Sequence, residues 1–550
     1  MRFPSALLLA LAAATLPAAE TAISAASIKA RTATLASDEF EGRAPGSAGE
    51  DKTVAYLERE FRSLGLKPGN PDGTFIQSVP MVGITTTMQT TFAAGGATLT
   101  PQPITEYVAR TRRTEAKLDF ANTEVVFCGY GVVAPEYRWD DFKGVDVRGK
   151  TIVVLVNDPP QPDPKNPGQL DPAVFKGKAM TYYGRWDYKY EQAARVGAAA
   201  CIIVHETGPA GYPFAVLGSR WGQEEFDLRQ PVGAAQPVGV QAWITMDFAR
   251  RLFAAAGQDY DKLKAAANDR AFRPVALATR ASFAVENKLR DITSRNVIAR
   301  LEGADAARRS EHVIYTAHWD HLGRDPKLKG DQIFNGAFDN ATGTAALVEI
   351  AAGLAARKPA PRRSVLFLAV TGEERGLLGA KYYAEHPLHP LERTLANLNM
   401  DRIQVFGPSR DLEIIGHGNS TIDDLATSIL ARSGRVVVPD TLPEKGYFYR
   451  SDHFEFAKQG VPAFYSKFGK DIIGRPAGYG ARLDEDYTTN DYHKVSDEMK
   501  PNWDFSGALE DVKFLIELGA TIADGDRWPE WKPGNEFKAK RDAMLKAAKK

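Results

Sequence analysis

The chain has 550 residues, of which 44% are hydrophobic and 25% are charged. One compact core does not extend over such a length, and the composition is that of a globular protein, so we expect two or more domains. The 69 basic side chains balance the 69 acidic ones, whereas a nucleic-acid-binding protein normally has a basic excess. The composition therefore argues against nucleic acid as a partner.

Residues 1–19 have the features of an export signal. Arg2 supplies a positive charge, an apolar run extends from Ala6 to Leu16, and small residues follow before Glu20. A buried N-terminal helix is the alternative, but no charge interrupts the run and it starts directly after the first residues. We predict a signal peptide and export to the periplasm or the extracellular medium. No later segment reaches about 18 unbroken apolar residues, so we predict no membrane span.

The chain has two cysteines, Cys128 and Cys201, and both lie in apolar runs. Two are too few for a disulfide scaffold in an exported protein of this size. Neither has a second cysteine at the spacing of a zinc finger. A single disulfide and two buried free thiols are both compatible with the sequence.

The first half of the chain changes its pattern near residue 122. Two helical stretches come first, and short β runs with two helices follow. This β-rich region holds few candidate catalytic groups, so we interpret it as a module inserted into another domain. The predicted helices are 22–35, 52–64, 188–196 and 246–256, and the predicted strands are 124–128, 150–156, 201–204 and 238–244.

From residue 296 strands and helices alternate, which is typical of an α/β sheet. We therefore predict an α/β fold with a mixed, mostly parallel central sheet that is flanked by helices. The predicted strands are 296–301, 313–317, 364–370, 412–415 and 462–465, and the predicted helices are 342–356, 422–432, 505–519 and a Lys-rich helix from residue 538.

Imidazoles and carboxylates follow successive strands of this α/β region. Ligands of open α/β sheets bind beyond the carboxyl ends of the strands. Each group alone is weak evidence, because a strand-end His-x-Asp is often a local hydrogen-bonded pair and a Glu pair is usually solvated. Together they supply enough ligands for two zinc ions that share one carboxylate, with a separate base. The candidate residues are His318, Asp320, Asp339, Glu373, Glu374, Asp401 and His493.

Five segments in order resemble the motifs of the M28 family of metallopeptidases. They are Ala317-His-Trp-Asp, Gly336-Ala-Phe-Asp-Asn-Ala-Thr-Gly, Thr371-Gly-Glu-Glu, Asn399-Met-Asp and Tyr492-His-Lys-Val-Ser-Asp. The resemblance implies the zinc exopeptidase fold with an inserted protease-associated domain. The implied parts are 20–117 and 286–525 for the peptidase domain, 118–285 for the insert and 526–550 for a charged tail.

The resemblance also implies a role for each motif residue. His318 and Asp401 would bind one zinc ion, Glu374 and His493 the other, and Asp339 both. Glu373 would be the general base, and Asp320 would orient the ring of His318. The peptide bond between Asp339 and Asn340 would be cis. His321 lies outside the family's ligand pattern.

Tyr449 is a further candidate from the residues themselves, as a hydrogen-bond donor to the oxyanion of the reaction. Tyr447 is close to it in sequence, and ordinary packing is the alternative role.

The predicted function is that of an exported aminopeptidase with two zinc ions and peptide substrates. A carboxypeptidase-like enzyme is an alternative, because Arg375, Arg402 and Arg450 offer partners for a substrate carboxylate. A cyclase of N-terminal glutamine and a binding scaffold without activity are further alternatives, but the complete ligand set argues against both. Histidine and carboxylate ligands also suit other divalent ions, and the oligomeric state is left open.

Overall fold

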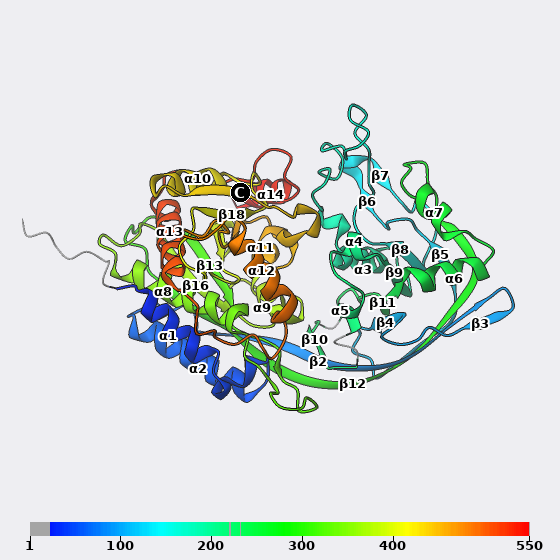
Figure 1. Ribbon diagram of the computed structural model, residues 1–550, viewed down its shortest axis with the longest axis horizontal. Coiled ribbons are helices and arrows are strands. Elements are labelled where there is room, and N and C mark those ends of the chain that lie inside the picture. Colours follow the sequence, from blue (N-terminus) through cyan, green and yellow to red (C-terminus); the bar gives the residue numbers. More distant parts are fainter. Residues whose placement is uncertain (1–21, 219–221, 232, 549–550) are drawn as a thin grey trace, which may run out of the picture.

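The computed structural model of the protein describes residues 22–218, 222–231 and 233–548. The predicted signal peptide therefore lies outside the described residues. The described chain folds into two lobes, joined by the long strands β2 (Ile76–Ala94) and β12 (Val275–Leu301) (Figure 1). None of the described helices is long and apolar enough to cross a membrane.

The first lobe contains a mixed sheet with the strand order β19-β18-β20-β17-β13-β16-β12. The neighbours β20, β17, β13 and β16 are all parallel, whereas β12 is antiparallel to β16, and β18 is antiparallel to β20 but parallel to β19. This confirms the predicted fold class. The strand bounds are β13 (His312–His318), β16 (Ser364–Val370), β17 (Thr394–Asn399), β18 (Asp411–Ile415), β19 (Val436–Pro439) and β20 (Ala463–Lys467).

Helices cover both faces of this sheet. One face packs against α1, α2, α8, α10 and α13 in a single apolar core, and the other against α9 and α11. The central helix α8 is buried from Thr342 to Leu354, because its many Ala and Gly residues allow close approach on every side. The bounds are α1 (Ala25–Leu35), α2 (Ala48–Ser63), α8 (Thr342–Ala356), α9 (Leu378–Glu385), α10 (Thr421–Arg432), α11 (His453–Lys458), α12 (Tyr479–Asn490) and α13 (Ser506–Asp524).

The second lobe continues the same sheet in the order β5-β8-β9-β11-β4. Each strand that the sequence predicts in this region is present. Cys128 and Cys201 are buried free thiols. The bounds are β4 (Tyr107–Arg110), β5 (Lys117–Phe127), β8 (Thr151–Leu155), β9 (Ala200–His205), β11 (Val240–Thr245), α3 (Trp186–Arg195), α6 (Met246–Ala255) and α7 (Tyr260–Ala266).

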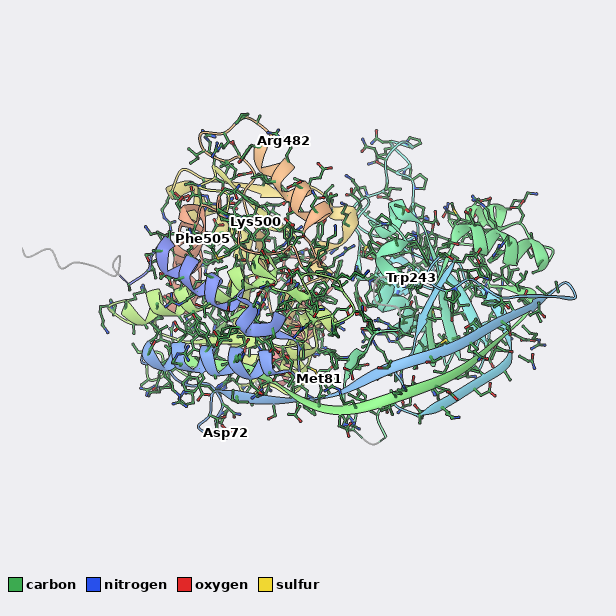
Figure 2. The ribbon with its side chains drawn as sticks, turned by 60° about the horizontal axis from the view of Figure 1, so that its bottom comes forward. Asp72, Met81, Trp243, Arg482, Lys500 and Phe505 are labelled. Carbon is green, nitrogen blue, oxygen red and sulfur yellow. The ribbon has the colours of Figure 1, made fainter. Side chains whose placement is uncertain are left out.

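The connecting strands β2 and β12 pair with each other from Ile76 to Ala94. Met81 marks the stretch of β2 between the lobes, and Trp243 marks the second lobe (Figure 2). The sequence predicts only the end of β12, because residues 289–291 are exposed on both faces and break the alternating pattern. β4 pairs with β11 of the second lobe, and β12 runs past residue 285. The domain boundaries at residues 117 and 285 stay predictions.

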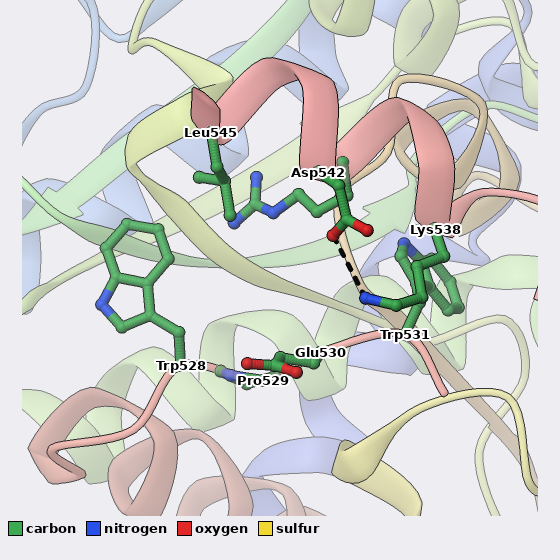
Figure 3. A pocket seen from close by; sticks show the side chains of 8 residues that line it. Trp528, Pro529, Glu530, Trp531, Lys538, Asp542 and Leu545 are labelled. Atoms are coloured by element: carbon green, nitrogen blue, oxygen red, sulfur yellow. Dashed lines mark hydrogen bonds and ion pairs between the residues drawn. The ribbon is translucent and has the colours of Figure 1, made fainter. Parts of the chain in front are cut away.

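The C-terminal tail packs against the first lobe. Trp531 is buried in one cluster with Phe448 and Phe537, and the tail ends in α14 (Lys538–Ala547). A hollow of about 480 Å³ lies between α14 and the segment 528–531 (Figure 3). None of the residues that line this hollow is a candidate metal ligand.

Candidate metal centre

The candidate residues gather at the carboxyl edge of the first lobe's sheet. His318 is the last residue of β13, Glu373 and Glu374 form a turn after β16, and Asp401 lies two residues beyond β17. Because β13, β16 and β17 are parallel neighbours, their carboxyl ends meet at one edge. The topology therefore brings together groups that are far apart in the sequence.

Asp339 lies between two imidazoles. It sits in the turn Ala337–Ala341, directly before α8, and its peptide bond to Asn340 is cis, as the resemblance implies. Its Oδ1 is 3.3 Å from His318 Nε2, and its Oδ2 is 3.5 Å from His493 Nε2. The two oxygens of one carboxylate thus face two different histidines, which is the arrangement that a bridging ligand requires.

Each of these histidines also faces a second carboxylate. His318 Nε2 is 3.7 Å from Asp401 Oδ1, and His493 Nε2 is 3.0 Å from Glu374 Oε2. The two groups formed around Asp339 are therefore the pairs that the sequence analysis expects.

His321 joins the cluster, which the sequence analysis does not expect. Its Nδ1 is 2.6 Å from Glu374 Oε1, so it occupies the carboxylate oxygen that does not face His493. His321, Asp339 and Glu374 have donor atoms within 4.8 Å of one another, as do His318, Glu373 and Asp401. His493 Nε2 faces both Asp339 and Glu374, as the ligand implied by the resemblance would, whereas His321 contacts Glu374 through Nδ1 and its buried Nε2 makes no hydrogen bond to a described residue.

Glu373 and Asp320 lie beside His318. The backbone N–H of Glu373 donates to Asp320 Oδ1 over 3.1 Å, which fixes the turn that carries both glutamates. Nδ1 of His318 is 3.2 Å from the backbone oxygen of Asp320 and 3.8 Å from its Oδ1. The carbonyl, more than the carboxylate, is thus the close partner of this ring nitrogen.

The charges of the cluster favour a bound cation. Asp339 and Glu374 are buried, and Asp401 is only 13% exposed in its side chain. His318 Nε2 is buried and makes no hydrogen bond to any described residue. Several carboxylates buried around an unsatisfied imidazole nitrogen are costly without a compensating positive charge. Nitrogen and oxygen donors of this kind suit zinc and related divalent ions, so the residues present fit a metal.

The pKa values of the cluster reflect this crowding. Burial raises the pKa of Glu373 well above its usual value, and the neighbouring Asp401 raises it further, although His318 opposes the shift. Burial also acts on Glu374, but His493 and His321 outweigh it and hold the pKa well below its usual value. The two adjacent glutamates thus differ, because Glu374 favours the ionised state and Glu373 favours holding a proton.

A second set of residues holds the loops in place. Oδ1 of Asp497 accepts from the backbone N–H of Phe338 over 3.0 Å, and Oδ2 accepts from that of Asp339 over 3.1 Å. The guanidinium of the buried Arg43 donates to the carbonyl oxygens of residues 35, 319, 335 and 336. Asp497 lies in the last segment quoted for the resemblance, but the roles of both residues become visible only in the three-dimensional contacts.

Tyr449 lies elsewhere. Its hydroxyl donates to Glu536 Oε1 over 2.8 Å, and its ring packs against Phe448 and Phe454. No described contact joins it to the metal-ligand candidates. The hydroxyl is engaged in the core below the tail, so this geometry does not support the predicted contact with an oxyanion.

One side of the cluster is open to solvent. His493 is 27% exposed in its side chain, and the ring of Tyr492 stacks on it with 3.8 Å between the centroids. On another side, β10 (Glu225–Leu228), which pairs with the connecting strand β2, packs beside the turn of Glu373, and the guanidinium of Arg375 lies 5.7 Å from the ring of Phe226.

Two known proteins with similar sequences are named as aminopeptidases. The chain is 38% identical over 127 residues to mouse aminopeptidase NAALADL1 and 32% identical over 113 residues to aminopeptidase YwaD of Bacillus subtilis. These matches cover 22% and 20% of this chain, and 15% and 22% of the relatives. The chain thus aligns with less than a quarter of the length of either relative.

The fold has a counterpart among solved structures. An aminopeptidase from Aneurinibacillus sp. strain AM-1 superposes with a TM-score of 0.50 at 20% identity, over 94% of this chain and 96% of that chain. At this identity the likeness concerns the fold alone.

The sequence pattern of peptidase family M28 matches residues 296–515. This segment contains every candidate ligand described above, from His318 to His493, together with Glu373. Residues 296–515, two fifths of the chain, are thus similar to peptidase family M28.

Proposed function

We propose that the protein is an exported aminopeptidase that hydrolyses the N-terminal residue of peptides with two zinc ions. The observation that carries the proposal is Asp339, whose two oxygens lie 3.3 Å and 3.5 Å from the Nε2 atoms of two different histidines. The match of residues 296–515 to peptidase family M28 and the names of the similar enzymes support the peptidase class. Export rests on the predicted signal peptide, and the second lobe is proposed to be a protease-associated domain.

The proposed ligand sets follow from the contacts. His318 and Asp401 would hold one ion, His493 and Glu374 the other, and Asp339 would contact both. When bound, the ions would lower the pKa of a water molecule and polarise the scissile carbonyl. His321 and Asp320 are assigned to positioning, because His321 contacts Glu374 and Asp320 accepts from the backbone of Glu373.

Glu373 is proposed to be the general base and acid. Its carboxylate would take a proton from the attacking water and return it to the leaving amine. Burial raises its pKa above the usual range, which is the direction that favours a carboxyl group that must both accept and release a proton. Glu374 is tied to His321 and His493, which leaves Glu373 free for proton transfer.

The test is hydrolysis of a panel of aminoacyl-p-nitroanilides by the mature protein. The protein is assayed as purified, after chelation and after zinc return, with bound metal measured in parallel. Glu373→Gln should lose about 10²- to 10⁴-fold in kcat, the usual contribution of a general acid–base, while it keeps its metal. Glu385→Gln is the matched control, because Glu385 is an exposed glutamate at the end of α9.

The outcomes separate the alternatives. Zinc-dependent cleavage that is lost only in Glu373→Gln supports the aminopeptidase. Bound metal without cleavage of any free-amine substrate would favour the carboxypeptidase-like alternative, which cleaves peptides at the C-terminus. A purified chain that neither binds zinc nor cleaves the panel would contradict the proposal.

A further inference from the structure

The guanidinium of Arg450 is unusual among the charged groups where the two lobes face each other. Its Nε and Nη2 atoms are buried, and neither makes a hydrogen bond to a described residue. Its neighbours are the rings of Tyr447 and Tyr212, whose centroids lie 5.4 Å and 5.9 Å from its Cζ. Stacking on two rings explains where the side chain lies, but it leaves the N–H donors unsatisfied.

Two arginines of β4 and the loop after it have acidic partners. Arg110 pairs with Glu225 at 3.7 Å and Arg112 with Asp227 at 3.9 Å. Arg450 has no such partner among the described residues. The boundary therefore holds one cation whose charge the described protein does not balance.

Arg185 of the second lobe also has an unsatisfied donor. It lies close enough to Arg450 that, after burial, it is the main cause that lowers the pKa of Arg450 to about 10. At neutral pH Arg450 thus stays charged. One nitrogen of Arg185 pairs with Asp187 at 3.3 Å, but its Nε is buried and makes no hydrogen bond to a described residue. Two guanidinium groups from different lobes thus lie near each other with donors to spare.

The segment that carries Arg450 contacts the strand that leads to the metal centre. Ser451, which follows Arg450, accepts a hydrogen bond over 2.8 Å from Asn399, two residues before Asp401. On the open side, Tyr492 stacks on His493, and it is close enough to influence the pKa of Arg450. Tyr492 thus contacts a candidate metal ligand and also acts on this guanidinium.

We propose that Arg450 and Arg185 form a subsite for a carboxylate group of the peptide substrate. The planar guanidinium matches the two oxygens of a carboxylate, and an anion would satisfy the buried donors of both side chains. The inference rests on the proposed peptidase function and adds a substrate class to it. The carboxylate is either the C-terminus of a short peptide or an acidic side chain.

The experiment compares substrates that differ only in one negative charge. X is the N-terminal residue that the p-nitroanilide panel shows to be cleaved best. X-Gly is compared with X-Gly-amide for a terminal carboxylate, and X-Asp-amide with X-Asn-amide for a side chain. We expect kcat/KM of the wild-type protein to favour the charged member of at least one pair by about 10- to 100-fold, the range expected for a hydrogen bond to a charged group.

The variants locate this preference. Arg450→Met should bring the ratio of kcat/KM between the charged and the neutral substrate of a pair close to one. Arg450→Lys should keep part of the preference for the charged substrate, and Arg185→Met should reduce that preference less than Arg450→Met does. Arg410→Met and Arg195→Met are matched controls and should keep the wild-type ratio, because both residues are more than half exposed and already paired with an acid.

Each outcome has a distinct meaning. Cleavage of both members of each pair at equal rates by the wild-type protein would overturn the subsite while the peptidase function stands. A preference that persists in Arg450→Met would also overturn it and would leave Arg450 as a packing residue. Cleavage of no substrate, with the p-nitroanilide panel also inactive, would be a failure of the proposed function itself.

Discussion

At the scale of single residues, His321 is the side chain whose role the structure changes most. Its Nδ1 is 2.6 Å from Glu374 Oε1, whereas the other oxygen of Glu374 faces His493. This contact is typical of a residue that orients a metal ligand, and loss of such a partner usually costs 10- to 100-fold in metal affinity. In His321→Asn the amide nitrogen can take the position of Nδ1, the atom that contacts Glu374. In His321→Gln the amide nitrogen takes the position of Nε2 instead.

We therefore expect His321→Gln to weaken zinc binding by about 10- to 100-fold and His321→Asn to weaken it less. Zinc affinity is measured by competition with a chromogenic chelator, and His386→Gln, an exposed histidine after α9, is the control. If Asn weakens binding as much as Gln, the hydrogen bond is not the function of His321, and direct coordination becomes the better explanation.

At the scale of elements, the turn that carries Asp339 depends on Asp497. The two oxygens of Asp497 accept from the backbone N–H groups of Phe338 and Asp339, and Oδ2 also accepts from the Tyr487 hydroxyl over 3.0 Å. An Asn at this position must direct its NH₂ group toward one of these donors. A buried donor left without an acceptor costs about 1–3 kcal/mol, so the turn should open more easily.

Asp497→Asn is thus expected to speed hydrogen exchange of the amides in residues 337–341 and to weaken zinc binding about tenfold or more. Tyr487→Phe removes only one of the three hydrogen bonds and should have a smaller effect. Asp486→Asn, at an exposed position on α12, is the control. Unchanged exchange in Asp497→Asn would show that the turn is held by other contacts.

Some of these elements could be predicted from the sequence and others could not. The parallel strands β13 and β16 are mostly apolar or β-branched and α8 is rich in Ala, so local pattern is sufficient to predict them. The parallel strand β17 was not predicted, because Asn397 and Asn399 interrupt its apolar pattern, and Asp401 beyond it was found through its motif alone. The roles of Arg43, Asp497 and His321 could not be predicted, because each contacts residues that are distant in the sequence or acts through one atom of its ring. Strand β2 was not predicted, since a partner strand more than 180 residues away supports it rather than its own pattern.

At the scale of the whole molecule, the tail connects the two lobes. Glu536 Oε1 accepts from the hydroxyl of Tyr449 in the first lobe and lies 3.6 Å from Lys176 Nζ in the second. Next to this contact, the ring of Tyr182 packs on Tyr449 and Phe454. The lobe boundary beside the metal centre therefore rests partly on one glutamate from the last part of the chain.

A double-mutant cycle of Tyr449→Phe and Glu536→Gln tests this connection. Because a hydrogen bond to a charged group contributes about 1.5–3 kcal/mol, we expect the two substitutions to be coupled by roughly that amount in the free energy of unfolding. We also expect faster proteolysis between the lobes in both single variants. Lys176→Met removes only the longer ion pair and should have a smaller effect. Zinc-dependent kcat on a neutral p-nitroanilide should change less than about threefold in Tyr449→Phe, since its hydroxyl faces the tail. A loss of 10²-fold or more in kcat, the usual cost of losing an oxyanion donor, would instead mean that Tyr449 turns toward the substrate during the reaction, and that the contact with Glu536 belongs to the free enzyme alone.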